Sequence, residues 1–402
     1  MYTFTARLYN HLTRLALLCL LATLTLIPAA AQGPTFTIGV LASSDSPLAR
    51  GVRLAVRNIN AEGGVLGADG SRFQLELAYA PIVTDGSQAV AQLAPEGVIA
   101  LIGPTTTTEL NTSLTALQIL NVPILTPATG DAIIIADTSD LVIRTRAADV
   151  LTARALADVL FNEQGVSNVL MYQFDADATA QAIGFQNAAT NFGVSVPAAQ
   201  LIGDTGSLEV AVDTVVNANP GAVVSYGNPA LASQFYQALR IAGYGGLFAH
   251  PQPIDPAFLG DLPADAFAGI IGANTWSFAA TDLTSAEFTL DYLRAFREIP
   301  IAVSAAGADS VALLTDAISR PGDLRTNLLT TEGIIGVQGV LSPTSLNPGE
   351  TSDNTAVIRI GSEGELNVIA RFAGATRLPG GNTTDELLVT ATPTPTATPD
   401  GV

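Results

Sequence analysis

The sequence contains no lysine, a single cysteine and two histidines, Cys19, His11 and His250. All 17 of its basic residues are arginines, against 36 acidic residues. P-loop NTPases, protein kinases and Schiff-base enzymes depend on a lysine, so these classes are excluded. A net charge of −19 leaves no concentrated basic surface, and nucleic acid is not expected as a partner. The chain of 402 residues, 48% hydrophobic and 13% charged, has the composition of two or three folded domains.

The first 31 residues have the pattern of an export signal. Arg7 and Arg14 precede an apolar run over Leu15–Ile27, which three alanines at 29–31 end. The run is short for a bilayer core, which needs roughly 20 residues. We expect cleavage after Ala31, the alternative being retention as an N-terminal anchor. Cys19 lies inside the run, which is not a lipoprotein pattern, so the protein is expected to be exported to the periplasm or cell envelope without a lipid anchor.

Cleavage would remove the only thiol and leave His250 as the single histidine. A cysteine-based zinc site is then impossible, and no metal or other cofactor is expected. At the other end, residues 379–402 carry a Thr-Pro repeat over 390–399. Proline fixes φ and removes backbone donors, which predicts an extended tail without a packed core. A frayed tail and a glycosylated or surface-tethering stalk both fit this segment.

Between the two ends, short apolar runs alternate with longer amphipathic patterns. Strands are predicted at 37–42, 74–80, 98–102, 123–125, 168–172, 222–226, 246–249 and 269–272. Helices are predicted at 48–60, 87–94, 106–120, 150–163, 178–192, 208–217, 229–242, 285–297 and 304–319. This alternation predicts parallel sheets with right-handed crossovers. Because about 340 residues exceed one comfortable core, two α/β lobes are expected.

Open parallel sheets bind ligands beyond the carboxyl ends of their strands. The segment 103–109, with four threonines, follows the predicted strand 98–102 and opens a helix, where free N–H groups suit an anionic group. Thr106 and Glu109 also have capping-box spacing, so some hydroxyls could serve the helix alone. The segment 126–131, which includes Thr129, follows the next strand as a turn. We interpret Thr106, Thr107 and Thr129 as candidate ligand contacts at one sheet edge.

In this context the chain resembles the substrate-binding proteins of ABC transporters with the type I periplasmic-binding fold, in the branched-chain amino-acid-binding (leucine/isoleucine/valine-binding) group. The resemblance runs over about residues 36–373. Its most specific piece is the Asn-Ile-Asn-Ala-Glu-Gly-Gly stretch at 58–64; further matches are 38–41, 51–67, 85–90, 102–104, 122–129, 144–145 and 336–342.

The resemblance implies a protein of two Rossmann-like lobes joined by a three-strand hinge, which closes around a small solute. We place the first lobe at 35–145 plus 276–339 and the second at 146–275 plus 340–376, with crossings near residues 145, 275 and 340. It also implies that Thr106, Thr107, Ala128 and Thr129 hold the ligand carboxylate. On the second lobe, Tyr226 matches a family position.

The second half of the implied site departs from the family pattern. Asp177 lies near the position of an expected tyrosine, and Gln252 aligns with an acidic residue that binds the ligand ammonium. An uncharged amide is a poorer partner for a cation. Asp175 or Asp177 could replace that charge. The ligand is therefore expected to be a small polar molecule, either an amino acid or a related compound.

Three further residues invite a role. His250 ends a predicted strand and fits a pocket or a position behind it, while Trp276, near a crossing, fits either a ligand cover or packing between lobes. Asp309 lies early in a predicted helix, where an acid favours the helix dipole. Catalysis by a Ser-His-Asp arrangement would need His250, yet no Gly-x-Ser-x-Gly elbow occurs. We do not expect an enzyme.

The interpretation is an extracytoplasmic solute-binding protein, monomeric, that delivers its ligand to an ABC permease in the membrane. The alternative is a sensor of the same shape that reports the solute to a membrane receptor instead of transporting it.

Overall fold

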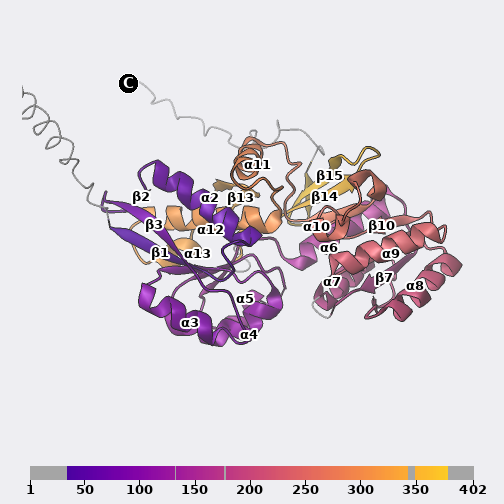
Figure 1. Ribbon diagram of the computed structural model, residues 1–402, viewed down its shortest axis with the longest axis horizontal. Helices are drawn as coiled ribbons and strands as arrows, with labels where there is room; N and C mark the ends of the chain where they lie inside the picture. The colour runs from indigo at the N-terminus through magenta and orange to yellow at the C-terminus, as the bar shows by residue number, and fades with distance from the viewer. Residues whose placement is uncertain (1–33, 132, 176–177, 343–348, 379–402) are drawn as a thin grey trace, which may run out of the picture.

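The computed structural model describes residues 34–131, 133–175, 178–342 and 349–378. The predicted signal segment 1–31, the predicted tail 379–402 and Asp177 lie outside these residues. The described chain forms two α/β lobes, each built around one sheet (Figure 1). The two-lobed α/β architecture predicted from the sequence is confirmed.

The sheet of the first lobe has six strands in the order β2-β3-β1-β4-β5-β6. They are β1 (Thr35–Val40), β2 (Val65–Leu66), β3 (Arg72–Tyr79), β4 (Ala100–Ile102), β5 (Ile124–Thr126) and β6 (Val142–Arg144). All neighbours pair in parallel except β2, which is antiparallel to β3. Every residue of β4, β5 and β6 is buried, as expected for strands that helices cover on both faces.

The helices of the first lobe come from both ends of the chain. They are α2 (Pro47–Ala61), α3 (Ser87–Leu93), α4 (Thr107–Leu117), α5 (Ile133–Ala136), α11 (Leu283–Phe296), α12 (Ala302–Ser319) and α13 (Leu324–Leu329). α2 and α12 cross at very close range. A Cβ atom at Gly51 would lie 2.0 Å from the carbonyl oxygen of Ser304, and one at Gly307 would lie 2.7 Å from that of Leu48. Glycine at both positions permits this contact.

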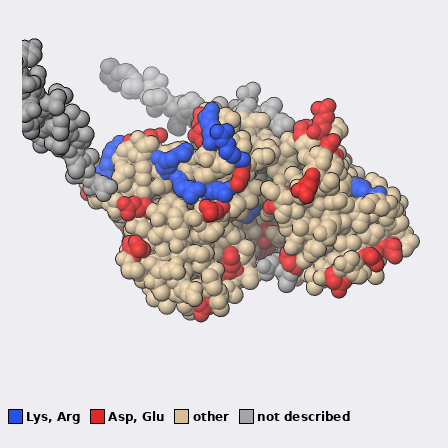
Figure 2. Space-filling model, in the orientation of Figure 1, with Lys and Arg blue, Asp and Glu red and all other residues tan. Residues whose placement is uncertain are grey.

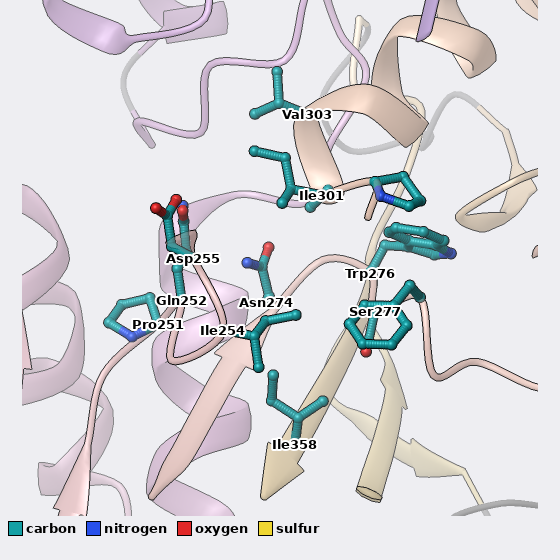
Figure 3. Close-up of a pocket in the computed structure, with 13 residues that line it drawn as sticks. Pro251, Gln252, Ile254, Asp255, Asn274, Trp276, Ser277, Ile301, Val303 and Ile358 are labelled. Carbon is teal, nitrogen blue, oxygen red and sulfur yellow. The ribbon is translucent and has the colours of Figure 1, made fainter. Parts of the chain in front are cut away.

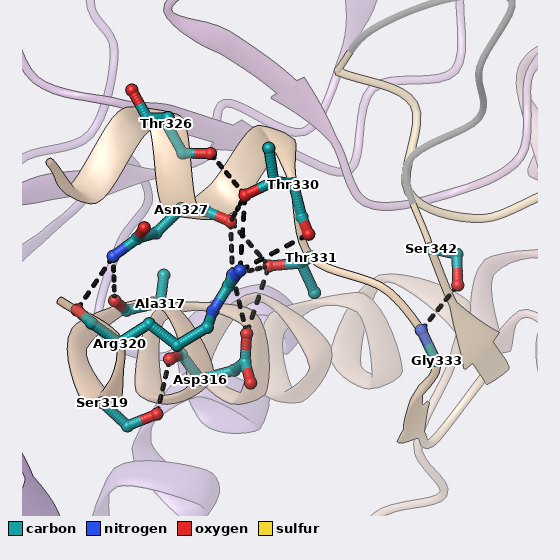
Figure 4. A network of polar contacts seen from close by, with 10 residues as sticks. All are labelled: Asp316, Ala317, Ser319, Arg320, Thr326, Asn327, Thr330, Thr331, Gly333 and Ser342. Atoms are coloured by element: carbon teal, nitrogen blue, oxygen red, sulfur yellow. Dashed lines mark hydrogen bonds and ion pairs between the residues drawn. The ribbon is translucent and has the colours of Figure 1, made fainter. Parts of the chain in front are cut away.

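A polar network around Arg320 joins α12 to α13 (Figure 4). The guanidinium forms an ion pair with Asp316 at 2.8 Å and donates to the Thr331 hydroxyl at 2.6 Å. The Asn327 amide donates to the carbonyl oxygens of Ala317 (2.9 Å) and Arg320 (3.0 Å). These bonds satisfy carbonyl groups at the end of α12 and fix that end against the next helix.

The sheet of the second lobe has eight strands in the order β16-β15-β14-β11-β10-β9-β7-β8. They are β7 (Val169–Gln173), β8 (Gln200–Leu201), β9 (Ala222–Tyr226), β10 (Leu247–Ala249), β11 (Ile271–Asn274), β14 (Asn354–Ile360), β15 (Leu366–Ala373) and β16 (Thr376–Leu378). β7 to β11 pair in parallel, but β14, β15 and β16 add an antiparallel meander beside β11. From the sequence we expected parallel strands alone, because the alternation of strand and helix patterns predicts crossovers and not turns between strands.

Helices cover both faces of this sheet. They are α6 (Asp149–Asp158) with the π-turn η3 (Val159–Glu163), α7 (Thr179–Thr190), α8 (Thr205–Ala218), α9 (Pro229–Ile241) and α10 (Pro256–Leu259). Alternation along β9 divides the core: Ala222, Val224 and Tyr226 pack in the cluster with α6 and α7, whereas Val223 packs in the cluster with α8 and α9. Because successive residues of a strand point to opposite faces of the sheet, β9 contributes side chains to the core on both faces.

The chain passes between the two sheets three times: after β6 at Thr145, after β11 at Thr275, and before β14. The third passage was expected near residue 340. In the structure, β13 (Gly339–Leu341) forms a hairpin with β12 (Ile334–Gly336), and Glu350 still bridges to Arg144 at the end of β6. The chain enters the second sheet with β14, more than ten residues later than expected. No strong strand pattern precedes β14 to mark this point in the sequence.

Gln338 links the first two crossings. Its side-chain amide donates to the carbonyl oxygen of Thr145 at 2.8 Å and to Asp309 at 3.0 Å, and its oxygen accepts from the Thr275 hydroxyl at 3.0 Å. Asp309 also accepts from the backbone N–H groups of Val337 (2.6 Å) and Gln338 (3.1 Å). Asp309 is buried and lies beyond the first turn of α12, so the expected role toward the helix dipole is wrong. Burial raises the pKa of Asp309 to about 6, although the hydrogen bonds from Gln338 and Val337 oppose the rise.

Acidic side chains are spread over both lobes on the face seen in Figure 2. On the same face, arginines gather over α2 and α11, where Arg50 pairs with Glu298 and Arg294 with Asp291. This scattered distribution fits a solvated acidic surface. Among the described residues, no helix has the length and apolar character needed to cross a membrane.

Candidate functional site

A cavity of about 470 Å³ lies between the lobes, at the carboxyl ends of strands from both sheets. We call it the cleft. Its wall follows β4, β5 and β6 in the first sheet and β7, β9, β10 and β11 in the second. The residues that concern its chemistry are Thr106, Thr107, Thr129, Arg146, Asp149, Asp175, Gln181, Tyr226, Gln252 and Asn274. Parallel sheets place ligand sites at this edge.

Five of the seven residues predicted from the sequence line the cleft together: Thr106, Thr107 and Thr129 from the first lobe, and Tyr226 and Gln252 from the second. Ala128 is buried and does not line it. The Ala128 backbone N–H donates to the Thr126 hydroxyl at 3.1 Å, inside its own turn. That N–H has a partner already, so the predicted ligand contact of Ala128 has no support in the geometry. Asp177 lies outside the described residues.

Thr106 and Thr107, at the start of α4, differ in the hydrogen bonds that their hydroxyl groups already form. Thr106 is the N-cap residue: its hydroxyl accepts from the Glu109 N–H and donates to the Glu109 carboxylate, both at 3.2 Å. This is only half of the capping box that its spacing predicts, because the Glu109 carboxylate accepts from the Thr106 hydroxyl and not from the Thr106 backbone N–H, but it occupies that hydroxyl. The Thr107 hydroxyl accepts from the Gly130 N–H at 3.0 Å and keeps its proton to donate. Thr107 is therefore the better ligand contact of the two.

The facing wall contains a buried donor without a partner. The Tyr226 hydroxyl is enclosed, and no described residue forms a hydrogen bond with it. Burial raises the pKa of Tyr226 and the nearby Asp149 raises it further, so the phenol stays protonated. A buried hydroxyl without a partner costs free energy unless a ligand or water satisfies it. Because Tyr226 lines the cleft, its hydroxyl is a candidate donor to a ligand.

Two acidic residues line the cleft. Asp149 is the first residue of α6, and its carboxylate accepts from the Gln181 amide at 3.1 Å and from the side chain of Thr129. Burial raises the pKa of Asp149, against the effect of these hydrogen bonds. Asp175 accepts from the Ala178 N–H at 2.9 Å. Sequence reasoning singled out Asp175 but missed Asp149, whose only signal is its place at a helix start after a strand.

Arg146 is the residue that sequence reasoning most clearly missed. It follows β6 and lies buried in the cleft wall. Its Nε donates to the Thr275 hydroxyl (3.0 Å), while Nη1 and Nη2 donate to the carbonyl oxygen of Pro127 (3.3 Å) and to Asn274 Oδ1 (2.9 Å). Burial lowers the pKa of Arg146 to about 10, although Asp149 opposes the shift, so the side chain is a cation at neutral pH. The signal was the pair of arginines two residues apart, at 144 and 146, around a strand end.

A smaller side pocket of about 30 Å³ adjoins the cleft (Figure 3). Pro251, Gln252, Asn274 and Val303 line both cavities. The rest of its wall is mainly apolar and includes Ile254, Trp276, Phe278, Ile301 and Ile358. It has room for about one methyl-sized group, by comparison with the volume that a water molecule needs. The cleft thus has a polar body and an apolar side branch.

Trp276 packs against α11 of the first lobe. Its indole N–H donates to the Ser285 hydroxyl at 3.0 Å, and its ring meets Phe288 edge-on at 5.9 Å. It also borders the side pocket.

His250, by contrast, does not line the cleft. It stacks on Phe258 at 4.9 Å and lies 3.2 Å from the Ser225 hydroxyl. Burial lowers the pKa of His250 to about 3, so the ring is neutral. The described residues contain no cluster of histidine, cysteine and carboxylate groups that could hold a metal ion.

Comparison with known proteins decides the family. Residues 35–342 match the family described as periplasmic binding protein. The chain belongs to this family. The resemblance seen in the sequence, to ABC transporter substrate-binding proteins of the branched-chain amino-acid group, is confirmed. No curated protein sequence matches the chain significantly.

Solved structures of periplasmic binding proteins share the fold of this one at low sequence identity. LivJ from Streptococcus pneumoniae, in complex with isoleucine, has a TM-score of 0.71 and 20% identity, covering 86% of this chain and 100% of its own. LivK from Thermotoga maritima, a leucine-binding protein, has a TM-score of 0.69 and 19% identity, over 84% and 99% of the two chains.

A solute-binding protein from R. palustris, in complex with benzoate, also has a TM-score of 0.69, with 16% identity over 88% and 99%. One periplasmic binding fold therefore carries both amino-acid and aromatic-acid ligands among these relatives. The family consists of solute-binding proteins rather than enzymes.

Proposed function

We propose that this periplasmic binding protein is an extracytoplasmic receptor that closes around a small polar solute and delivers it to an ABC permease. The observation that carries the proposal is the cleft itself. Polar residues from two different sheets line one cavity, and one of them, Tyr226, has a buried hydroxyl without a partner among the described residues. A structural cavity with no ligand would have little use for a buried polar donor.

Each lobe supplies only half of the cleft. Thr107 and Thr129 stand on the first lobe, and Tyr226 and Gln252 on the second, with the three crossings between them. A solute that touches both halves favours the closed arrangement by the free energy of the added contacts. Closure around a ligand explains why a binding site should be built across two lobes rather than within one.

The remaining roles follow from the same proposal. We place the protein outside the cytoplasm, without a lipid anchor, as a monomer that presents its closed form to the membrane permease. Thr107, Thr129, Tyr226 and Gln252 are the proposed ligand contacts, and Thr106 serves mainly as the cap of α4. No catalytic step is proposed, so the solute should leave the protein chemically unchanged.

A thermal-shift screen of the purified chain tests the proposal. The solutes are amino acids, short amides, polyols, nucleobases and aromatic acids. A true ligand at about 100 times its Kd should stabilise the fold by roughly 2.7 kcal/mol. Small-angle X-ray scattering should then show a smaller radius of gyration with that ligand. Absence of any stabilising solute would contradict the proposal, as would a ligand that binds without compaction.

A further inference from the structure

The guanidinium of Arg146 has N–H groups that donate to no described residue. Of its five N–H groups, three are used, by Thr275, Pro127 and Asn274. The other two, one on each Nη nitrogen, have no acceptor among the residues that the structure describes. Because Arg146 lines the cleft, these donors belong to a side chain that a solute can reach.

The comparison with Arg144, two residues earlier, shows what is missing. Arg144 is buried as well, but its guanidinium forms a two-point ion pair with Glu350. Arg146 has no carboxylate within 4.0 Å of its nitrogen atoms in the described part of the chain. A buried cation without a direct counter-ion carries a large desolvation cost. Arg144 therefore has a counter-ion within the protein, whereas Arg146 lines the cleft without one.

The acidic residues of the cleft do not fill that role. The Asp149 carboxylate is held by Gln181 and Thr129, and that of Asp175 accepts from the Ala178 N–H. Asp149 is close enough to influence Arg146 through space but forms no ion pair with it. The place for an anion next to Arg146 is therefore open to the solute.

The position of the guanidinium is fixed before any ligand arrives. Its three acceptors come from two strand ends, Pro127 after β5 in the first sheet and Asn274 and Thr275 at the end of β11 in the second. A planar fork held in this way presents paired donors, which match the two oxygens of a carboxylate. Asn274 also borders the apolar side pocket, so an apolar group can lie beside the anion.

We propose that Arg146 binds a carboxylate group of the solute, with the Tyr226 hydroxyl as a second donor from the opposite wall. The ligand class is then a small carboxylic acid that carries a compact apolar group. The carboxylate lies at the end of β6 and not at the hydroxyl-rich start of α4. This inference rests on the proposed function, because it names the chemical group of the solute that the receptor recognises.

The test uses matched acids and amides with the full-length protein. Isothermal titration compares benzoate with benzamide and isoleucine with isoleucinamide, and includes inorganic phosphate and sulfate. At least one acid should bind tenfold or more tightly than its amide and than either inorganic anion. An amide that binds as well as its acid would overturn the proposal, and so would phosphate or sulfate as the tightest probe. If neither acids nor amides bind but another solute of the thermal-shift screen does, this inference fails and the proposed function stands; if no solute of that screen binds, both fail.

Variants identify the residue. Arg146→Gln should weaken binding of the acid at least tenfold and leave any amide binding unchanged. Arg154→Gln, which removes the same charge from the exposed face of α6, should bind like the wild type. Arg146→Lys keeps the charge without the fork and should recover only part of the affinity, and Tyr226→Phe should weaken it severalfold. Should Arg146→Gln fail to fold, the lysine and phenylalanine variants still decide. Unaltered acid affinity in the folded variants refutes the role of Arg146.

Discussion

At the scale of single residues, the two arginines near the end of β6 have different roles. Arg144 holds two segments of the protein together, and Arg146 is proposed to bind the solute. Arg144 points to Glu350 and ties the segment before β14 to the first sheet, and its Nη1 also donates to the carbonyl oxygens of Thr129 (3.2 Å) and Gly130 (2.5 Å). Arg146 lies in the cleft. Side chains two residues apart would share a face in an ideal strand, but β6 ends at Arg144 and the chain turns there.

Glu350→Gln is expected to destabilise the protein. The change leaves the Arg144 guanidinium buried with a neutral partner, and broken buried ion pairs cost about 3–5 kcal/mol. Urea unfolding followed by circular dichroism measures the loss. Glu332→Gln removes an exposed carboxylate and should change stability by less than about 0.5 kcal/mol. Equal stability of the two variants would show that the Arg144–Glu350 pair contributes nothing.

Sequence reasoning reached part of the site for a definite reason. Thr107 and Thr129 follow apolar runs, and a residue after a buried strand is easy to place at the ligand edge. Arg146 and Asp149 follow β6, a strand of three residues that contains an arginine. Because that strand gives no recognisable apolar run, the two charged residues behind it could not be placed in the cleft.

At the scale of elements, the crossing of α2 and α12 depends on two glycines. Gly51 lies against the backbone of Ser304, where no side-chain rearrangement can make room. Alanine is the better helix former by about 1 kcal/mol, so intrinsic propensity alone would favour replacement. The sign of the stability change on replacing Gly51 by alanine therefore tells whether packing or helix propensity dominates.

Gly51→Ala should destabilise the first lobe, because overpacking typically costs about 1–3 kcal/mol and here exceeds the gain in propensity. Thermal unfolding followed by circular dichroism should show a lower Tm. Gly203→Ala is the matched control, since a Cβ there meets nothing within 4 Å. A Tm for Gly51→Ala at or above that of the wild type would mean that the helices separate without cost.

The elements themselves were predicted unevenly. The strand Ala222–Tyr226 has the bounds that its sequence indicated, because five apolar or small residues stand between turn signals. The antiparallel strands β14 and β15 were not predicted, although segments such as Ala356–Ile358 are apolar. A search for strands followed by helices passes over a meander, in which the connections are turns.

At the scale of the whole molecule, the crossings are tied together by buried polar groups. Gln338 bonds with Thr145 of one crossing and Thr275 of another, and Asp309 anchors it from α12. Thr275 in turn accepts from Arg146 in the cleft. The link between cleft and crossings is therefore a continuous chain of hydrogen bonds.

Asp309 makes stability depend on pH in a predictable direction. Its pKa of about 6 in the folded protein exceeds the ordinary value of 3.8, so the folded state binds the proton more tightly. Stability then falls as pH rises from about 4 to about 6, by roughly 3 kcal/mol from this group alone.

Urea unfolding at several pH values from about 4 to 7 measures this dependence. The wild type should lose stability relative to Asp309→Asn across that range. Asp45→Asn, a change at an exposed loop position, is the control. Parallel stability curves for wild type and Asp309→Asn would contradict the assignment.

The arrangement of β11 beside β14 has a consequence for how the protein is made. The second sheet gains its last three strands from residues 354–378, and the first lobe needs α12 from residues 302–319. Neither lobe can complete its core until most of the chain has left the ribosome. Pairing over such sequence separations is slow, because loop closure precedes the contacts that reward it. If the chain is exported unfolded, as proposed above, this order of assembly would keep it from folding before it crosses the membrane.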